Sequence, residues 1–176
     1  MADIFCDENT PDYVQFDCGV ELAGIVGIGL IDGSVTPVTT ELEDPAEWTT
    51  WVDDSPQLYF PIQETRGSYP GGTPVEEEGF GTVPTLRTGA DHEATVEVRG
   101  VEDNRDFWAK VNRRSKWHVV LITRSGLMLY LQSASVYAKI IADQSIKSQL
   151  RWNVSIKWTD DLSNPEVLTA PTGIFY

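Results

Sequence analysis

The sequence predicts a mainly β protein: a single β-sandwich or barrel domain over residues 1–176, with one or two short helices. The 176 residues suit one hydrophobic core, because two domains would each approach the smallest size that buries a useful core. Apolar residues make up 41% and aromatic residues 10% of the chain, a composition typical of folded proteins. Several stretches also alternate apolar and polar residues with the period of two that is typical of strands.

The first predicted strand spans residues 20–31. Bulky apolar residues occupy most of its even positions, while Ala23, Gly27 and Gly29 keep the opposite face small. A face without large side chains allows another part of the chain to approach the backbone closely. We therefore expect a strand with one bulky face and one closely covered face.

The other predicted strands follow in the second half of the chain. Segments 117–123 and 127–131 flank Arg124-Ser125-Gly126, a short link that predicts a hairpin. Segments 93–99 and 135–142 also alternate. The last strand, 150–158, places Leu150, Trp152, Val154, Ile156 and Trp158 on one face and Arg151, Asn153, Ser155 and Lys157 on the other.

Two short helices are predicted. Asp44-Pro45-Ala46-Glu47 resembles a capping box with proline in the first turn, and Trp48, Trp51 and Val52 then form an apolar stripe. The second helix runs from residue 103 or 104 to 114. Acids precede bases along it, which suits the helix dipole, and Phe107, Trp108 and Val111 form its buried stripe.

Residues 63–92 and the two ends of the chain lack such patterns. The 63–92 segment holds six glycines and the run Glu76-Glu77-Glu78, so its composition predicts a long loop, which is typically functional or disordered. We expect it to reach a neighbouring subunit, flanked by extended N- and C-terminal arms. The tail ends in Ile174-Phe175-Tyr176, which can either fold back onto its own domain or insert into a neighbour.

The charge is strongly negative and unevenly distributed. The formal net charge is −14, with 20 acids and 3 bases in residues 1–100 and 7 acids and 10 bases in the remainder. Phosphate binding requires clustered positive charge, so the acidity disfavours a protein that grips nucleic acid. No apolar run reaches the roughly 20 residues of a membrane-spanning helix. The acidic start, where a signal peptide would be basic, predicts no secretion signal.

No catalytic constellation is evident, so we expect no enzyme activity, no catalytic residue and no cofactor-binding residue. The chain has no glycine-rich phosphate loop, nucleophile elbow or paired-histidine helix. Asp53-Asp54 and Asp160-Asp161 are interpreted as solvated turn residues. His92 is expected in an exposed loop. His118 lies on the strand face opposite to Trp117 and Val119. If that face is solvated, His118 has no group to activate.

Metal binding is likewise not expected. Cys6 and Cys18 have no spacing typical of zinc sites, and we interpret them as free thiols. The acids Asp7, Glu8, Asp12 and Asp17 match no calcium-loop spacing. The six tryptophans fall on the apolar stripes of their elements, except Trp117, so core packing explains them better than a carbohydrate platform does.

One group of basic residues is a candidate contact surface. Arg105, Lys110, Arg113, Arg114, Lys116 and Arg124 cluster around the second helix and the hairpin. No aromatic residues interleave with them as base stacking requires, so a DNA patch is disfavoured. We expect instead a subunit contact with the acidic first hundred residues.

The order of these elements resembles the tail-tube proteins of tailed bacteriophages. The segments that carry the resemblance are 63–92, 93–99, 104–114, 117–131 and 150–158. The run 44–48 followed by a short helix is also similar to virion proteins of Bacteroidetes phages.

The resemblance implies a β-sandwich or barrel subunit that assembles with itself. Such subunits form homomeric rings, usually sixfold and stacked, through which DNA passes as cargo. It further implies contacts with other tail or neck proteins, no membrane partner, and a location in the virion after assembly in the host cytoplasm. Neck, hub and ring proteins share this fold. The alternative is a β-sandwich module that binds a carbohydrate or a protein.

Overall fold

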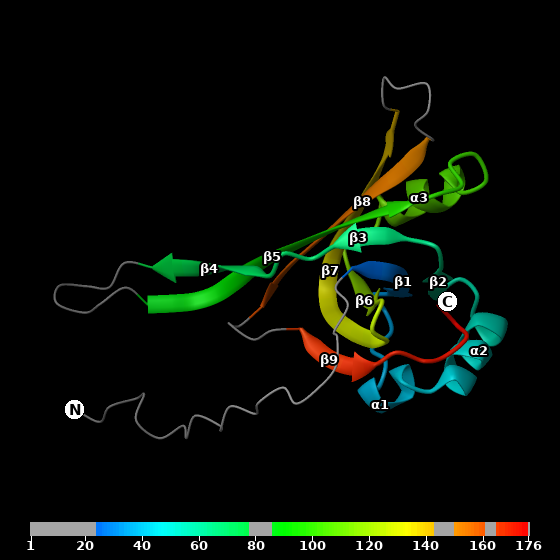
Figure 1. Cartoon of the computed structure of the whole chain (residues 1–176), viewed down its shortest axis with the longest axis horizontal. Helices are drawn as coiled ribbons and strands as arrows, with labels where there is room; N and C mark the ends of the chain where they lie inside the picture. The colour runs from blue at the N-terminus through cyan, green and yellow to red at the C-terminus, as the bar shows by residue number, and fades with distance from the viewer. Residues whose placement is uncertain (1–23, 78–85, 143–149, 161–164, 176) are drawn as a thin grey trace.

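A computed structural model describes residues 24–77, 86–142, 150–160 and 165–175 of the chain (Figure 1). The described residues are mainly β, with 52% in strands and 16% in helices. The described strands are β1 (Ile25–Asp32), β2 (Tyr59–Ile62), β3 (Arg66–Ser68), β4 (Gly72–Glu77), β5 (Leu86–Val98), β6 (Trp117–Thr123), β7 (Leu127–Ile141), β8 (Arg151–Asp160) and β9 (Glu166–Thr169). The described helices are α1 (Thr39–Leu42), α2 (Pro45–Asp54) and α3 (Arg105–Val111).

The strands form one antiparallel sheet that closes on itself. Its order is β2-β1-β3-β5-β8-β7-β6, and β6 also pairs with β1 over most of their length. The circuit β1-β3-β5-β8-β7-β6 therefore returns to β1 as a barrel. The strand β4 pairs with β5 and the strand β9 pairs with β7, so both lie outside this circuit.

The barrel interior is filled by alternate residues of its strands. Ala94, Val96 and Val98 of β5 point inward together with four residues of β8, as the alternation predicted. The cluster continues into α3 through Trp108 and Val111, both about 1% exposed. The helix is shorter than the predicted segment 104–114, but the predicted stripe does face the core.

A second apolar layer covers the outside of β1, β6 and β7. It contains Leu42 and Trp48 of the two N-terminal helices, and Val120 and Ile122 of β6, all fully buried. The strands β1 and β6 are therefore buried on both faces, and an alternating pattern cannot reveal the second covered face. This layer explains why His118, expected on a solvated face, is 6% exposed.

The short helix α2 forms as its sequence predicted. The carboxylate of Asp44 accepts a hydrogen bond from the amide of Ala46 at 2.8 Å, and Pro45 occupies the first turn. The indole nitrogen of Trp48 donates to the carbonyl of Leu42 at 2.8 Å, which fixes α2 against α1. Trp51 stacks on the ring of Tyr59 with centroids 4.8 Å apart.

The C-terminal tail folds onto its own domain and does not extend as an arm. Phe175 is fully buried beside Trp48, with ring centroids 5.0 Å apart. It lies over the glycine face of β1, where a Cβ on Gly27 would meet the Phe175 Cβ at 3.0 Å. The prediction of a closely covered glycine face is confirmed, and the tail is what covers it.

The described part of the predicted loop at 63–92 is largely strand, and this corrects the sequence interpretation; residues 78–85 lie outside the described residues. It contains β3, β4 and the first half of β5, joined by hydrogen-bonded ladders. Its glycines mark close approaches: a Cβ on Gly67 would lie 2.6 Å from the Thr95 carbonyl oxygen, and one on Gly89 would lie 2.9 Å from the Asp160 carbonyl oxygen. The predicted strand 135–142 is likewise not separate, because it continues β7.

Candidate assembly surfaces

The strands β4 and β5 form an arm that projects away from the helices and the barrel (Figure 1). The register runs from Gly72 opposite His92 to Glu77 opposite Leu86. Five of the six residues of β4 are exposed, and the sixth, Val75, is half-buried. We call this two-stranded projection, residues 72–77 and 86–92, the arm.

The arm's own polar contacts contribute little to its stability. Arg87 Nε donates to Glu76 Oε1 at 3.1 Å, with both side chains at least half exposed. An exposed ion pair of this kind contributes at most about 1 kcal/mol. The ladder with β5, and the packing at the root of the arm, must therefore hold it in place.

Three aromatic rings fix the root of the arm. His92 is 4% exposed and stacks on Trp158, with centroids 4.9 Å apart and planes 7° apart. The hydroxyl of Tyr69 lies 2.6 Å from His92 Nδ1, within hydrogen-bonding distance. On the other side of the imidazole lies Gly72, where a Cβ would come within 2.3 Å of the ring.

The expectation that His92 occupies an exposed loop is therefore wrong. His92 has the parity of Ala94, Val96 and Val98, so extending the predicted strand by one residue would have placed it on the buried face. Tyr69 and Gly72 were not singled out by the sequence. Their only signal was the unusual number of glycines around them.

Two of the edge strands among the described residues contain a proline. Among the described strands, β4 pairs only with β5, and it contains Pro74. In the described part of the chain, β2 pairs only with β1, and it contains Pro61. Proline has no amide hydrogen to give a neighbouring strand, and edge prolines limit unwanted sheet extension. Contacts through side chains are thus favoured over a continuous intermolecular ladder.

The polar face of β8 pairs with acids of β5. Lys157 Nζ lies 3.5 Å from Glu93 Oε1, and Arg151 Nε lies 3.0 Å from Glu97 Oε1. The Ser155 hydroxyl also donates to Glu93 at 2.9 Å. The two bases of this face, Arg151 and Lys157, therefore have acidic partners within the chain.

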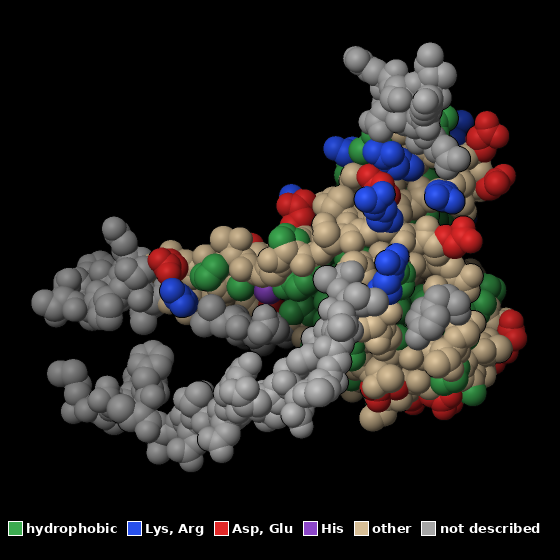
Figure 2. Space-filling view, in the orientation of Figure 1, with side chains coloured by type: hydrophobic (Ala, Val, Ile, Leu, Met, Phe, Trp, Pro, Cys, Tyr) green, Lys and Arg blue, Asp and Glu red, His purple; other side chains and the backbone are tan. Residues whose placement is uncertain are grey.

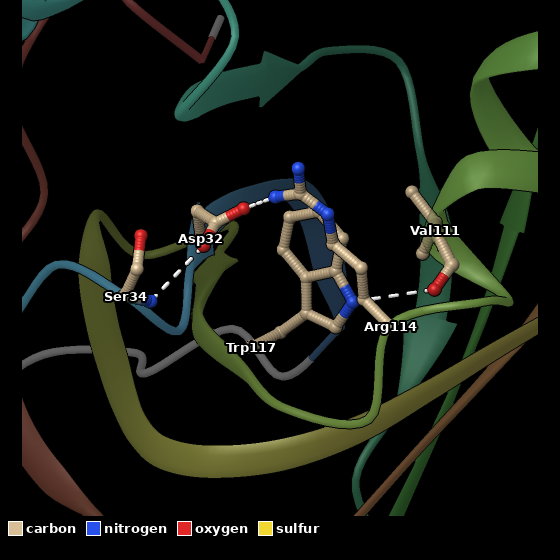
Figure 3. Close-up of polar contacts among 5 residues, drawn as sticks. All are labelled: Asp32, Ser34, Val111, Arg114 and Trp117. Atoms are coloured by element: carbon tan, nitrogen blue, oxygen red, sulfur yellow. Dashed lines mark hydrogen bonds and ion pairs between the residues drawn. The ribbon is translucent and has the colours of Figure 1, made fainter.

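The basic cluster is also partly satisfied within the chain. The guanidinium of Arg114 forms an ion pair with Asp32, which is only 7% exposed (Figure 3). The Arg114 guanidinium carbon lies 5.6 Å from the ring centroid of Trp117, where a cation–π interaction is favourable. The second Asp32 oxygen accepts the amide of Ser34 at 3.0 Å. Arg114 is a structural residue, while Arg105, Lys110, Arg113, Lys116 and Arg124 remain exposed.

The second histidine belongs to a buried hydrogen-bonded pair. The Tyr130 hydroxyl lies 3.2 Å from His118 Nδ1. Burial lowers the pKa of His118, which favours its neutral form at pH 7. Burial, and secondarily the nearby charge of Glu166, raise the pKa of Tyr130 to about 12. Both groups are therefore neutral at pH 7, so the pair can be buried without the cost of burying a charge.

The acidic candidates do not form a site in the described part of the chain. Asp53 and Asp54 are exposed at the end of α2, and Asp160 ends β8. No group of three or more His, Cys, Asp or Glu side chains among the described residues is placed to hold a metal. Asp161, Cys6, Cys18 and the acids at positions 7, 8, 12 and 17 lie outside the described residues. No described helix is long and apolar enough to cross a membrane.

The tryptophans provide no exposed platform for a sugar. Five of the six are at most 6% exposed: Trp48, Trp108, Trp117, Trp152 and Trp158. The sixth, Trp51, is half-buried against Tyr59. The core interpretation is confirmed, and it includes Trp117, whose place the sequence left open. No family model, curated protein or solved structure matches this chain.

Proposed function

We propose that this protein is a structural subunit of a phage virion, a tail-tube protein or an adjoining neck or ring protein. In this proposal its copies assemble into homo-oligomeric rings that stack around a channel for DNA. The observation that carries the proposal is the exposed arm, which projects from a closed barrel whose circuit does not require it. Such a projection adds surface but little core, which suits contact with another copy.

The charge of the chain supports a channel through which DNA passes. With a net charge of −14, the protein repels phosphate at short range. A wall that attracted DNA would bind its phosphates, because counterion release makes that binding favourable, and the bound DNA would pass more slowly. An acidic subunit therefore suits DNA as passing cargo better than DNA as a ligand.

Removing the outer arm tests the proposal. The variant replaces residues 75–89 with Asn-Gly, which connects Pro74 to its partner Ala90 through a two-residue hairpin turn. The β3 pairing and the His92 stack remain in place. Glu76→Ala, which keeps the full arm and loses only its exposed ion pair, is the matched control.

The readout is sedimentation velocity over a concentration series, with negative-stain microscopy of the fastest species. Wild type and Glu76→Ala are expected to form rings or tubes. The shortened variant is expected to remain a folded monomer with unchanged near-UV circular dichroism. A wild-type protein that stays monomeric at millimolar concentration, or rings of normal size from the shortened variant, would contradict the proposal.

A further inference from the structure

Two apolar side chains lie exposed at the outer end of the β7–β8 hairpin. Ile140 is 48% exposed and Leu150 is 55% exposed. Leu150 has the parity of Trp152, so the buried stripe of β8 continues past the end of the barrel, where no described residue covers it. Ile140 lies opposite Trp152 in the ladder, which makes Ile140 and Leu150 diagonal neighbours on one face. We call this pair the hairpin knob.

The same molecule carries an apolar groove between α2 and α3. Val52 and Pro56 line it from the α2 side, Pro61 and Ile62 from β2, and Phe107 from α3. Pro56 is exposed and the other four are half-buried, so apolar surface is accessible along the groove. We call it the α2–α3 groove. Its free strand edge at β2 cannot extend the sheet easily because of Pro61.

Acidic residues flank the α2–α3 groove. Asp53 and Asp54 directly follow the lining residue Val52 at the end of α2, and both are exposed. On the α3 side, three exposed acids and three exposed bases lie near the lining residues: Glu102, Asp103 and Asp106, with Arg99, Arg105 and Lys110, so the excess of negative charge comes from Asp53 and Asp54. The surroundings of the groove are therefore negative overall.

Basic residues flank the hairpin knob. Lys139 directly precedes Ile140 and is exposed on the opposite face of β7, from which its long side chain adds positive charge near the knob. The side chain of Asn112, after the end of α3, donates to the Ala138 carbonyl at 2.8 Å and accepts the Ala138 amide at 2.7 Å. This attachment brings the exposed Arg113 beside β7. Figure 2 shows several Lys and Arg side chains beneath the end of this hairpin, with some Asp and Glu side chains beside them, and Asp and Glu side chains along the edge that carries α2.

We propose that the hairpin knob of one copy occupies the α2–α3 groove of the next copy. The inference rests on the self-assembly proposed above and names the surfaces that meet. One chain carries both an exposed apolar projection with basic flanks and an apolar groove with acidic flanks, so a second copy supplies the complementary partner of each. Because the two surfaces differ, the contact is heterologous, and copies add head to tail until a ring closes.

Single substitutions test each surface. Ile140→Asp and Leu150→Asp place a charge on the knob, and Pro56→Arg places a long cation in the groove. A second groove variant, Val52→Arg, separates the effect of the cation from the effect of losing the proline. Each is expected to raise the dissociation constant for assembly roughly 30-fold or more, as a central interface residue does. Tyr137→Asp and Val167→Asp, at exposed apolar positions outside both surfaces, are matched controls with wild-type assembly expected.

Mixing the two classes of variant tests the head-to-tail pairing. A knob variant keeps its groove and a groove variant keeps its knob, so an equimolar mixture has one productive contact. Sedimentation velocity is expected to show a 1:1 heterodimer from the mixture, and monomers from each variant alone. A like-to-like contact would give no such complementation.

The outcomes separate this inference from the proposed function. If wild type assembles, and the knob or groove variants assemble equally well, the inference is overturned and the proposed function stands. A mixture that stays monomeric while wild type assembles also overturns it. If wild type itself never assembles, the proposed function fails and this inference fails with it.

Discussion

The C-terminal phenylalanine offers the sharpest test of how the outer layer is stabilised. Phe175→Ala removes a fully buried ring that packs against Trp48 at 79° and covers the glycine face of β1. The hydrogen bond from Gln63 Nε2 to the Ile174 carbonyl, at 2.6 Å, does not involve the ring and should remain. The substitution therefore isolates the apolar contribution of one side chain.

The expected loss follows from the buried area. Removing about 150 Å² of apolar surface at about 25 cal/mol per Å² costs about 4 kcal/mol. The end of the chain can partly collapse into the space, so we expect a loss of roughly 3 kcal/mol, at the lower end for Phe→Ala in cores. With a urea m-value of about 2.5 kcal/mol/M, the unfolding midpoint should fall by about 1.2 M.

Urea unfolding followed by tryptophan fluorescence is the assay, because Trp48 lies beside the deleted ring. Thr172→Ala, at an exposed position of the same tail, is the control and should leave the midpoint unchanged. A midpoint shift below about 0.3 M at constant m-value, little more than extrapolation error, would refute the reasoning. The tail would then contribute nothing to its own domain and would be free to insert into a neighbour.

Three further predictions concern buried contacts. The pKa of Tyr130 is raised from 10.0 to about 12, so its stabilising effect is complete below pH 10 and is lost as the pH rises to about 12. That loss is about 3 kcal/mol. Tyr130→Phe should remove it from chemical unfolding curves measured across this range, leaving the smaller losses from Tyr59 and Tyr69, whose pKa values are also raised. Gly72→Ala should lower the free energy of unfolding by about 1–3 kcal/mol, because its Cβ would clash with the confined His92 ring. Thermal unfolding that matches wild type would contradict this packing at the root of the arm. Arg114→Met should lower the free energy of unfolding by about 2 kcal/mol, since it leaves the nearly buried Asp32 carboxylate without its cation. Asp32→Asn should lower it by less. Equal unfolding midpoints for both variants and wild type would show that the pair has no net effect.

The sequence determined the strands whose pattern depends on one buried face. The alternation in β5 and β8 was correct because water on one side and core on the other impose a period of two. The cap of α2 was also predictable, since Asp44 and Pro45 act within one turn of the helix. The tryptophans could be assigned to the core because they fall on the apolar stripes of their strands and helices.

The sequence could not show which strands are covered by other side chains on both faces. His118 has the phase of an outward residue, yet it is 6% exposed and stacks on Tyr130, on the face that the second apolar layer covers. Gly27 and Gly29 indicated that something approaches β1 closely, but identifying Phe175 required the fold, because the two segments are far apart in the chain. The hairpin knob shows the opposite case: Leu150 has the parity of a core residue, and only the end of the barrel leaves it exposed.

The arm best separates local from tertiary determinants. Its composition is rich in glycine and poor in apolar residues, and alone it predicts a loop, because local propensity gives no reason to extend the chain. The arm's strands form because β5 is long enough to pair with β8 at one part and with β4 at another, with His92 stacked at the junction. Composition and alternation thus determined a mainly β, acidic domain with capped helices. The closure of the barrel, the second apolar layer and the projecting arm depended on contacts between distant segments, whose energies appear only when the fold brings them together.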